Sequence, residues 1–329
     1  MKNSISVVIP TYAPDLNNIS NTIQSVWDCS EQSNLDVEII VVDNGPNPTK
    51  DLKSAVETLG CLYKYTDVVG ANHARNLGAS MSAGDILYFT DDDCILLEGC
   101  LDNILKVHQY GEFLVGGKVV LKYESAVPDW MCHSFESMLA KLDLTNDNLI
   151  GGTILDITDD PAKYIVSANM SIKRVVFNMM DGFDERHGYF GKTELAPNDE
   201  LTLINNCRNS NMIRVVYTNS SVVEHIIPEE RTTEEYFYKR YYGQGLADSR
   251  TTESSYKQMF PDSDLETVLT NTVLKKTLLS NWLPDIFQNS LEKKKFASKE
   301  AKRNFIRIFV NCTNQYIQAV KDYMEKSDG

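Results

Sequence analysis

The chain has 329 residues, of which 42% are hydrophobic and 24% charged, which fits one large globular domain with an appendage or two small domains. Its formal net charge of −14 argues against a general nucleic-acid-binding protein, because phosphate backbones require a basic surface. No apolar run approaches the roughly 20 residues that cross a bilayer, and the N-terminus turns polar too soon for a signal peptide, so we expect a cytoplasmic protein.

The first two-thirds of the chain alternates short apolar, β-branched runs with amphipathic stretches. Continuous apolar runs are typical of a parallel sheet covered on both faces, and the alternation predicts βαβ units. The expected strands are residues 5–11, 37–43, 86–90, 113–121, 164–172 and 213–223, and the expected helices are residues 16–29, 51–59 and 71–83. From about Thr232 the pattern is helical to the end. The predicted fold class is α/β, a mostly parallel sheet flanked by helices with a C-terminal helical extension, in domains of residues 1–250 and 251–329.

Three of the predicted strands end in polar or acidic residues. Their exits are Pro10-Thr11-Tyr12, Asp43-Asn44-Gly45 and Asp91-Asp92-Asp93. Ligands of open α/β sheets bind outside the carboxyl ends of the strands, so the three exits together predict a binding site. Each exit alone also has a structural explanation, since Asn-Gly is a turn signal and Asp a common helix cap.

The acidic triplet suggests a metal site. Along an extended backbone, residues two apart share a face, so we expect Asp91 and Asp93 to project together while Asp92 turns away into local hydrogen bonds. Carboxylates that close raise one another's pKa unless a cation lies between them. Mg²⁺ and Mn²⁺ commonly combine one or two carboxylates with substrate phosphates, so the spacing suits a metal that holds a diphosphate. A solvated acidic loop is the alternative.

The seven cysteines include no Cys-x-x-Cys pair, which favours reduced thiols over a disulfide framework or a zinc site. Cys94 and Cys100 flank the acidic triplet, and packing is the favoured role for both.

Six blocks of sequence resemble, in order and approximate spacing, those of the family 2 glycosyltransferases over roughly residues 4 to 250. The blocks are ISVVIPTYAP, VEIIVVDNG, GANHARNLGASMSAGDILYFTDDDC, SANMSIKR, GFDERHGYFG with NDELTL, and VVEHIIPEERTTEEYFYKRYYGQG. The DxD triplet alone is a weak signal, and the specificity lies in the ordered set. The resemblance implies the GT-A (Rossmann-like) fold, an inverting enzyme, and Mn²⁺ or Mg²⁺ as cofactor.

The resemblance also implies roles for individual residues. The nucleotide-binding residues would be Pro10, Thr11, Tyr12, Asp43 at the base edge, Arg75 beside the acidic cluster or a phosphate, and Asp91 at the ribose or metal. The metal ligands would be Asp91, Asp93 and His225. A histidine that is simply hydrogen-bonded at a strand end is the alternative for His225.

An inverting transfer is a single in-line displacement, so it needs a base on the acceptor hydroxyl. The family places this base in an acidic doublet at the start of a helix, which makes Asp199 the first candidate here and Glu200 the second. Asn198 stands where the commoner pair has an acid, so the register is open by one residue. The same residues also make a good helix N-terminus, because acids are favoured there by the helix dipole.

Two further segments are expected to touch the substrates. Residues 167–169 would end a strand with small side chains and leave room for the donor sugar, which makes Asn169 a candidate sugar-binding residue. Arg231 and Arg240 lie in a basic cluster that could clamp the diphosphate from a mobile loop, with a helical surface face as the alternative.

Basic residues between 293 and 307, followed by an apolar run, predict an amphipathic helix near the C-terminus. Such a helix could rest on an anionic membrane surface, where a lipid-linked acceptor would be found. Packing against the catalytic domain is the favoured interpretation.

The sequence therefore favours a metal-dependent inverting glycosyltransferase of polysaccharide or cell-surface glycan synthesis. It would move a sugar from a nucleotide-diphosphate donor, with UDP favoured by family frequency, to a hydroxyl of a glycan or lipid-linked acceptor. A catalytically silent nucleotide-sugar or divalent-cation binding protein is the first alternative. A nucleotidyltransferase is weaker, because the first strand is not followed by a Gly-rich phosphate loop bearing Lys or Arg.

Overall fold

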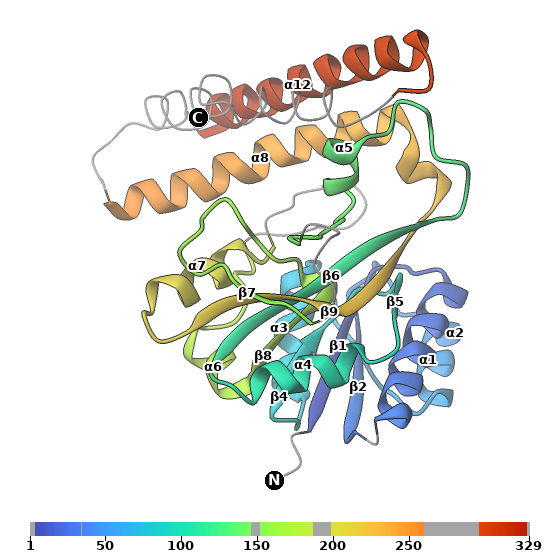
Figure 1. Ribbon diagram of the computed structural model, residues 1–329, viewed down its shortest axis with the longest axis vertical. Helices are drawn as coiled ribbons and strands as arrows, with labels where there is room; N and C mark the ends of the chain where they lie inside the picture. The colour runs from blue at the N-terminus through green and yellow to red at the C-terminus, as the bar shows by residue number, and fades with distance from the viewer. Residues whose placement is uncertain (1–3, 34, 146–151, 187–198, 260–295, 328–329) are drawn as a thin grey trace. The chain divides into compact units, whose positions relative to one another are not determined.

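The computed structural model describes residues 4–33, 35–145, 152–186, 199–259 and 296–327. These residues form a nine-stranded sheet in the order β3-β2-β1-β4-β8-β6-β9-β5, with β7 paired to β9 (Figure 1). The strands are β1 (Ile5–Thr11), β2 (Val37–Asp43), β3 (Leu62–Tyr65), β4 (Ile86–Phe89), β5 (Cys94–Leu96), β6 (Phe113–Tyr123), β7 (Ile154–Asp156), β8 (Met170–Lys173) and β9 (Arg214–Ile227).

Two compact units divide the chain. The first contains the described residues up to 122, from 140 to 186 and from 199 to 226, and the second those from 123 to 139 and from 227 onward. Helices of the first unit are α1 (Leu16–Gln32), α2 (Lys50–Thr58), α3 (Ala71–Met81), α4 (Cys100–His108), α6 (Arg174–Met179) and α7 (Leu201–Asn209), with a short 3₁₀ helix, η1 (Ser167–Asn169). The second unit holds α5 (His133–Ser137), η2 (Glu229–Thr232), α8 (Glu234–Met259) and α12 (Lys299–Ser327).

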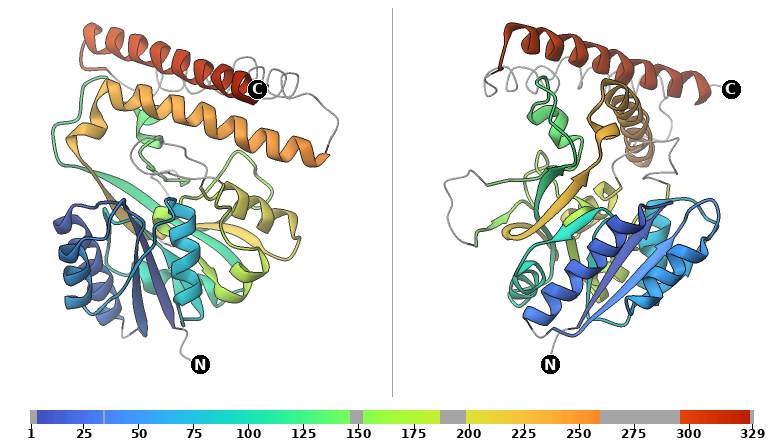
Figure 2. Two further views of the ribbon diagram at one scale, coloured as in Figure 1. Left: turned by 180° about the vertical axis from the view of Figure 1, so that it is seen from behind. Right: turned by 90° about the vertical axis from the view of Figure 1, so that its right-hand side faces the viewer.

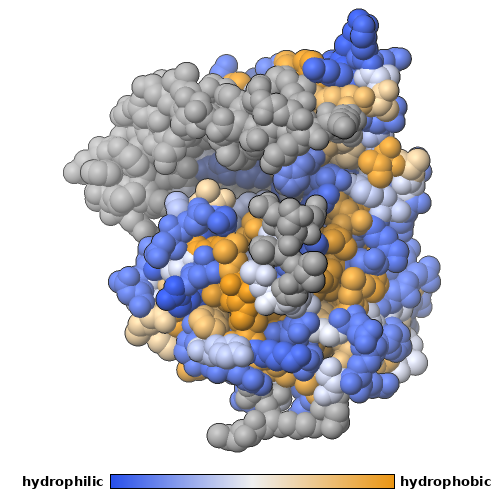
Figure 3. All heavy atoms as spheres, viewed as in Figure 1, coloured by the Kyte–Doolittle hydropathy of each residue, from blue (hydrophilic) through white to orange (hydrophobic). Residues whose placement is uncertain are grey.

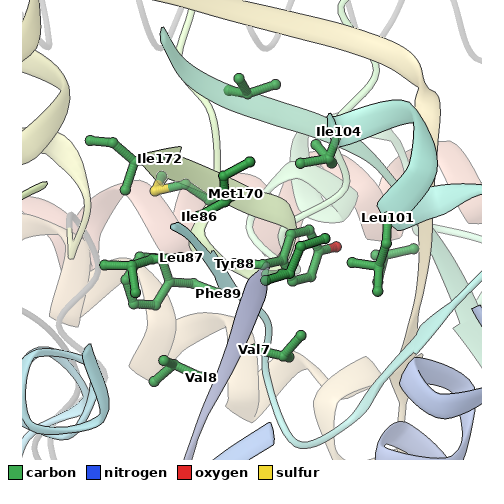
Figure 4. Close-up of a cluster of buried hydrophobic side chains, with 14 of the residues drawn as sticks. Val7, Val8, Ile86, Leu87, Tyr88, Phe89, Leu101, Ile104, Met170 and Ile172 are labelled. Atoms are coloured by element: carbon green, nitrogen blue, oxygen red, sulfur yellow. The ribbon is translucent and has the colours of Figure 1, made fainter. Parts of the chain in front are cut away.

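Strands β1 to β4 form the parallel part of the sheet, with β1 between β2 and β4. Every residue of β1 and β4 is buried, which explains why both read as unbroken apolar runs rather than alternating ones. Figure 4 shows the core around these strands, where Val7 and Val8 of β1 lie near Tyr88 and Phe89 of β4 and Met170 and Ile172 of β8.

The remaining strands join antiparallel: β8 pairs with β4 and β6, and β9 pairs with β5 and β7. The predicted α/β class with a C-terminal helix is thus confirmed, and the parallel pairing is confined to one part of the sheet. The strand expected at 164–172 begins only at Met170, because residues 167–169 turn into η1. The expectation that Asn169 ends a strand is therefore wrong: the residue precedes one.

The parallel strands are connected by helices in the manner of a doubly wound sheet. Helix α1 starts where the Asp15 carboxylate accepts hydrogen bonds from the backbone N–H groups of Asn17 and Asn18, and it packs beside α2 and α4. Helix α3 packs on β1 and β2 and returns the chain from β3 across the sheet to β4 (Figures 1 and 2). Right-handed crossovers place α3 on the face opposite α1 and α2.

The second unit is built around aromatic side chains and a pair of long helices. The ring of Phe135 lies 4.8 Å from that of Phe237 and 5.9 Å from that of Phe305, between centroids. Helices α8 and α12 run side by side in the same direction, and a Cβ added to Gly245 would lie 2.6 Å from the Tyr316 carbonyl oxygen. Glycine is therefore the residue that this helix contact tolerates.

The predicted amphipathic C-terminal helix corresponds to α12. Phe305, Ile308 and Phe309 are buried, whereas Arg307 pairs with Glu234 of α8 through both terminal guanidinium nitrogens. Residues 293–295 of the basic stretch lie outside the described residues. Residue 250 lies within α8, and the division into domains 1–250 and 251–329 stays a prediction.

Among the described residues, none of the helices is both long and apolar enough to span a membrane. Hydrophilic side chains are mixed with hydrophobic ones over the face seen in Figure 3.

Candidate active site

The candidate site lies at the carboxyl ends of β1, β2 and β4. The chain leaves β1 toward β2 on one side, and β4 lies on the other, so the strand order reverses at β1. Such a reversal opens the crevice in which α/β proteins bind ligands. The three predicted exits, after Thr11, Asp43 and Phe89, are therefore brought to one edge of the sheet.

Arg75 of α3 is the centre of a buried cluster at this edge. Its Nη2 donates to Asp91 Oδ1 and its Nη1 donates to Asp199 Oδ2, both at 3.0 Å. Asn72, one turn earlier, accepts from Arg75 Nη1 at 3.1 Å and donates to the Asp199 carbonyl oxygen at 2.9 Å. The guanidinium also lies 5.6 Å from the centroid of the Phe183 ring. The arginine thus holds the predicted base and the first carboxylate of the triplet at fixed positions.

Charge and burial separate the two candidate bases. Burial raises the pKa of Asp199, and the Arg75 guanidinium opposes that rise. Burial and the neighbouring Asp199 charge raise the pKa of Glu200 to about 8. Both residues directly precede α7 (Leu201–Asn209). The environment therefore favours a proton on Glu200, whereas the Asp199 carboxylate has the Arg75 cation beside it.

Asp93 and His225 form a second pair at the site. Asp93 Oδ1 lies 3.2 Å from His225 Nε2, and the Ile226 N–H donates to the Asp93 carbonyl oxygen at 2.8 Å. Carboxylate oxygen suits Mn²⁺ and Mg²⁺, and imidazole nitrogen suits transition metals, so this pair fits Mn²⁺ better than Mg²⁺. Asp91 points instead to Arg75, and the ligand atoms that converge within 4.8 Å belong to Asp93, Cys94 and His225.

The orientation of Asp92, the middle carboxylate of the triplet, is not set by the alternation of side chains along a strand, because residues 92 and 93 form a turn. The Asp92 side chain accepts a hydrogen bond from the Thr11 hydroxyl, and its carbonyl oxygen accepts one from the Thr22 hydroxyl at 3.1 Å. Asp92 is therefore hydrogen-bonded within the protein, but these partners lie 81 and 70 positions away rather than nearby in sequence, and the premise of an extended triplet is wrong. Its partner Thr11 is itself a predicted nucleotide-binding residue.

Asp43 is held in place at the end of β2. Its Oδ1 accepts from the Gly45 N–H at 2.9 Å and its Oδ2 accepts from the Tyr63 hydroxyl at 2.7 Å. An ionised carboxylate has about four acceptor positions, so capacity remains for the edge of a base. Pro10 and Thr11 are buried beside it, and Tyr12 is half-buried.

The side-chain amide of Asn169 makes all of its hydrogen bonds to other residues of the protein. Its amide nitrogen donates to the carbonyl oxygens of Lys118 and Ser221 at 3.0 and 3.1 Å, and its amide oxygen accepts from the hydroxyls of Tyr88 and Ser221. The side chain is fully buried, and all four of its hydrogen-bonding positions are used. The structure thus gives Asn169 a role in joining strands and leaves it no group for a sugar.

Arg231 and Arg240 belong to the second unit and lie in helices rather than in a loop. Arg231 lies in η2. Arg240, in α8, is buried, and it donates to the Met138 carbonyl oxygen at 3.3 Å and to Gln244 Oε1 at 3.1 Å. These contacts hold the second unit together, and donor binding by either arginine stays a prediction.

Sequence reasoning missed two residues that orient the site. Asn72 fixes both Arg75 and Asp199, and Tyr63 fixes Asp43. The spacing of Asn72 and Arg75, three apart on one predicted helix face, could have indicated the first. Tyr63 lies in β3, whose four residues alternate between exposed and half-buried and carry no clear strand signal.

A solved structure shares this architecture. The crystal structure described as GalNAc-T7 with UDP, GalNAc and Mn²⁺ aligns with a TM-score of 0.50 at 13% identity, over 84% of this chain and 57% of that one. At this identity the likeness shows the fold alone, which is the GT-A fold of glycosyltransferases.

The family follows from the sequence match. The model described as glycosyl transferase family 2 matches residues 6–182, more than half of the chain, so the protein belongs to that family and is a glycosyltransferase.

Curated relatives carry related names. A Haloferax volcanii protein described as glucosyl-dolichyl phosphate glucuronosyltransferase is 23% identical over 314 residues, covering 93% of this chain and 92% of that protein. Glycosyltransferase AglE of the same organism is 32% identical over 125 residues, covering 36% of this chain and 40% of that protein.

Proposed function

We propose that the protein is a metal-dependent inverting glycosyltransferase that moves a sugar from a nucleotide-diphosphate donor, UDP favoured, to a hydroxyl of a lipid-linked acceptor. The observation that carries the proposal is the Arg75 bridge between Asp199 and Asp91, beside the Asp93–His225 pair. The full-length relative named for a dolichyl-phosphate substrate supports the lipid-linked acceptor. Such an acceptor would place the protein at the cytoplasmic face of a membrane, in contact through the exposed basic residues at the start of α12, which are Lys299, Lys302 and Arg303.

In the proposed reaction the acceptor oxygen bonds to the anomeric carbon as the bond from that carbon to the diphosphate oxygen breaks. The acceptor proton passes to the Asp199 carboxylate, which Arg75 holds in one orientation, with Glu200 as the second candidate. Asp93 and His225 would hold a divalent cation, whose chemistry is to neutralise charge on the departing diphosphate.

The nucleotide would bind at the exits of β1 and β2. Asp43, fixed by Tyr63 and Gly45, would accept from a ring N–H of the base, which uracil offers and cytosine lacks. Pro10, Thr11 and Tyr12 would line the base and ribose, with Asp91 beside the ribose.

The test is turnover of a panel of nucleotide sugars with Mn²⁺, with and without an extract of polyprenyl-linked acceptors. We expect Asp199→Asn to lower turnover by about 10²–10⁴-fold, because it removes the base, while binding of UDP is kept. Asp159→Asn, at an exposed position, is the matched control. Binding of nucleotide with no turnover of any donor would support the silent binding protein instead. Equal activity in the two variants would exclude Asp199 as the base.

A further inference from the structure

Cys94 lies against the proposed metal pair. It is the first residue of β5 and pairs with His225 across the antiparallel β5–β9 ladder, and Asp93 immediately precedes it. One ligand atom from each of Asp93, Cys94 and His225 lies within 4.8 Å of the other two, and the thiol lies 3.9 Å from Asp93 Oδ1. An oxygen, a sulfur and a nitrogen donor thus lie close together.

The three donors are held by backbone structure rather than by a free loop. The β5–β9 pairing fixes Cys94 opposite His225, and the hydrogen bond from the Ile226 N–H fixes the carbonyl of Asp93. Cys94 is fully buried, and His225 is 6% exposed. A site whose donors are already in place loses little conformational entropy when an ion binds.

We propose that Cys94 is a third ligand of this site and makes it a binding site for thiophilic divalent cations such as Zn²⁺ and Co²⁺. Mn²⁺ and Mg²⁺ gain little from sulfur and would use Asp93 and His225, whereas a thiophilic ion gains the thiolate as well. Binding releases the thiol proton to solvent. Zn²⁺ would therefore compete with the ion that activates transfer, and this competition, unlike the binding itself, rests on the function proposed above.

The test uses the full chain freed of metal and titrated with Co²⁺ alone, without donor or acceptor. We expect a sulfur-to-cobalt charge-transfer band in the near ultraviolet for the wild type and for the control Cys61→Ser, which alters another buried thiol. Cys94→Ser should lose the band and weaken Zn²⁺ binding at least ~10-fold while changing Mn²⁺ binding much less. His225→Gln should weaken all three ions.

The outcomes are decisive whether or not the proposed metal-dependent transfer is observed. No band in the wild type, or a band that survives in Cys94→Ser, overturns the proposal. If Cys94→Ser does not fold, Cys94→Ala keeps the position apolar and answers the same question, with the thermal unfolding curve as the check on folding. Zn²⁺ inhibition of Mn²⁺-dependent turnover, weaker in the Cys94 variant, tests the competition separately.

Discussion

Two carboxylates of one triplet are neutralised in different ways. Asp91 is paired with Arg75, a permanently charged and buried guanidinium that also holds Asp199. Asp93 is paired with His225, an imidazole that carries a charge only when protonated. Two residues apart in sequence, one carboxylate is paired with a permanent cation, and the other with a group whose charge depends on its protonation.

The difference separates a rigid ion-paired cluster, which holds the proposed base, from the proposed metal pair. Burial lowers the pKa of the Arg75 guanidinium, but the facing carboxylates of Asp91 and Asp199 outweigh that effect and raise it. The guanidinium therefore stays charged, and the cluster around it is part of the folded core.

The comparison predicts its largest effect at Arg75. Replacing it in Arg75→Met keeps most of the apolar stem but leaves the buried Asp199 and half-buried Asp91 without their cation. We expect a loss of about 3–5 kcal/mol in the free energy of unfolding, measured by urea denaturation at pH 7. His225→Gln, which removes one contact of Asp93, should cost about 1 kcal/mol or less, the typical net effect of one hydrogen bond. Equal losses of stability in the two variants would show that Asp91 and Asp93 depend on their partners to the same extent.

A second prediction concerns Glu200 and pH. Because its pKa in the folded protein is about 8, above the ordinary value of 4.5, the folded state keeps a proton that the unfolded state gives up as pH rises. The contribution of Glu200 to the free energy of unfolding is therefore fully present below about pH 4.5, declines between pH 4.5 and pH 8, and is lost above pH 8. Glu200→Gln should remove this decline. The free energy of unfolding of the variant minus that of the wild type should be larger at pH 9 than at pH 5 by on the order of 1 kcal/mol or more. Unfolding curves at the two pH values measure it.

Glu185 is a control for Glu200, because its pKa is shifted in the opposite direction. Burial alone would raise the pKa of Glu185, but hydrogen bonds from Asn76 and His73 outweigh it and lower the pKa. Its stabilising effect is therefore present above its ordinary pKa and is lost as pH falls. Glu185→Gln should destabilise the protein at pH 7 and less so at pH 4. A gain for both variants at high pH would show that the Glu200 effect is not specific.

Strand exits were readable from sequence because β1, β4 and most of β2 are buried. Unbroken apolar runs gave β1, β2 and β4, and chain order with right-handed crossovers then brings their ends together. Antiparallel pairing was not readable, since a buried strand has the same apolar pattern in either direction. For the same reason the predicted parallel arrangement held only for the strands joined by helices.

The sequence could not predict which side chains pair with one another inside the site. Arg75 was expected near the acidic cluster, but its bond to Asp199 spans 124 positions and depends on where α7 begins. Asn169 shows the opposite error: the family resemblance suggested that small residues ending a strand leave room for the donor sugar, and the structure uses Asn169 to join strands. Local patterns identify residue types suited to chemistry, whereas tertiary contacts decide which of them remain available for it.

The smallest effect is predicted at Tyr63, which holds a third carboxylate with a neutral donor. Tyr63→Phe removes the hydrogen bond to Asp43 Oδ2 but leaves the ring and the Gly45 contact, so Asp43 should keep its place with more freedom. We expect UDP affinity, measured by calorimetry with Mn²⁺, to fall about 2–10-fold, equivalent to the 0.5–1.5 kcal/mol of one hydrogen bond. Tyr65→Phe, at the end of the same strand, is the matched control. If Tyr63→Phe weakened UDP and CDP binding equally, Asp43 would not be reading the ring N–H of the base, and its fixed position would serve the fold alone.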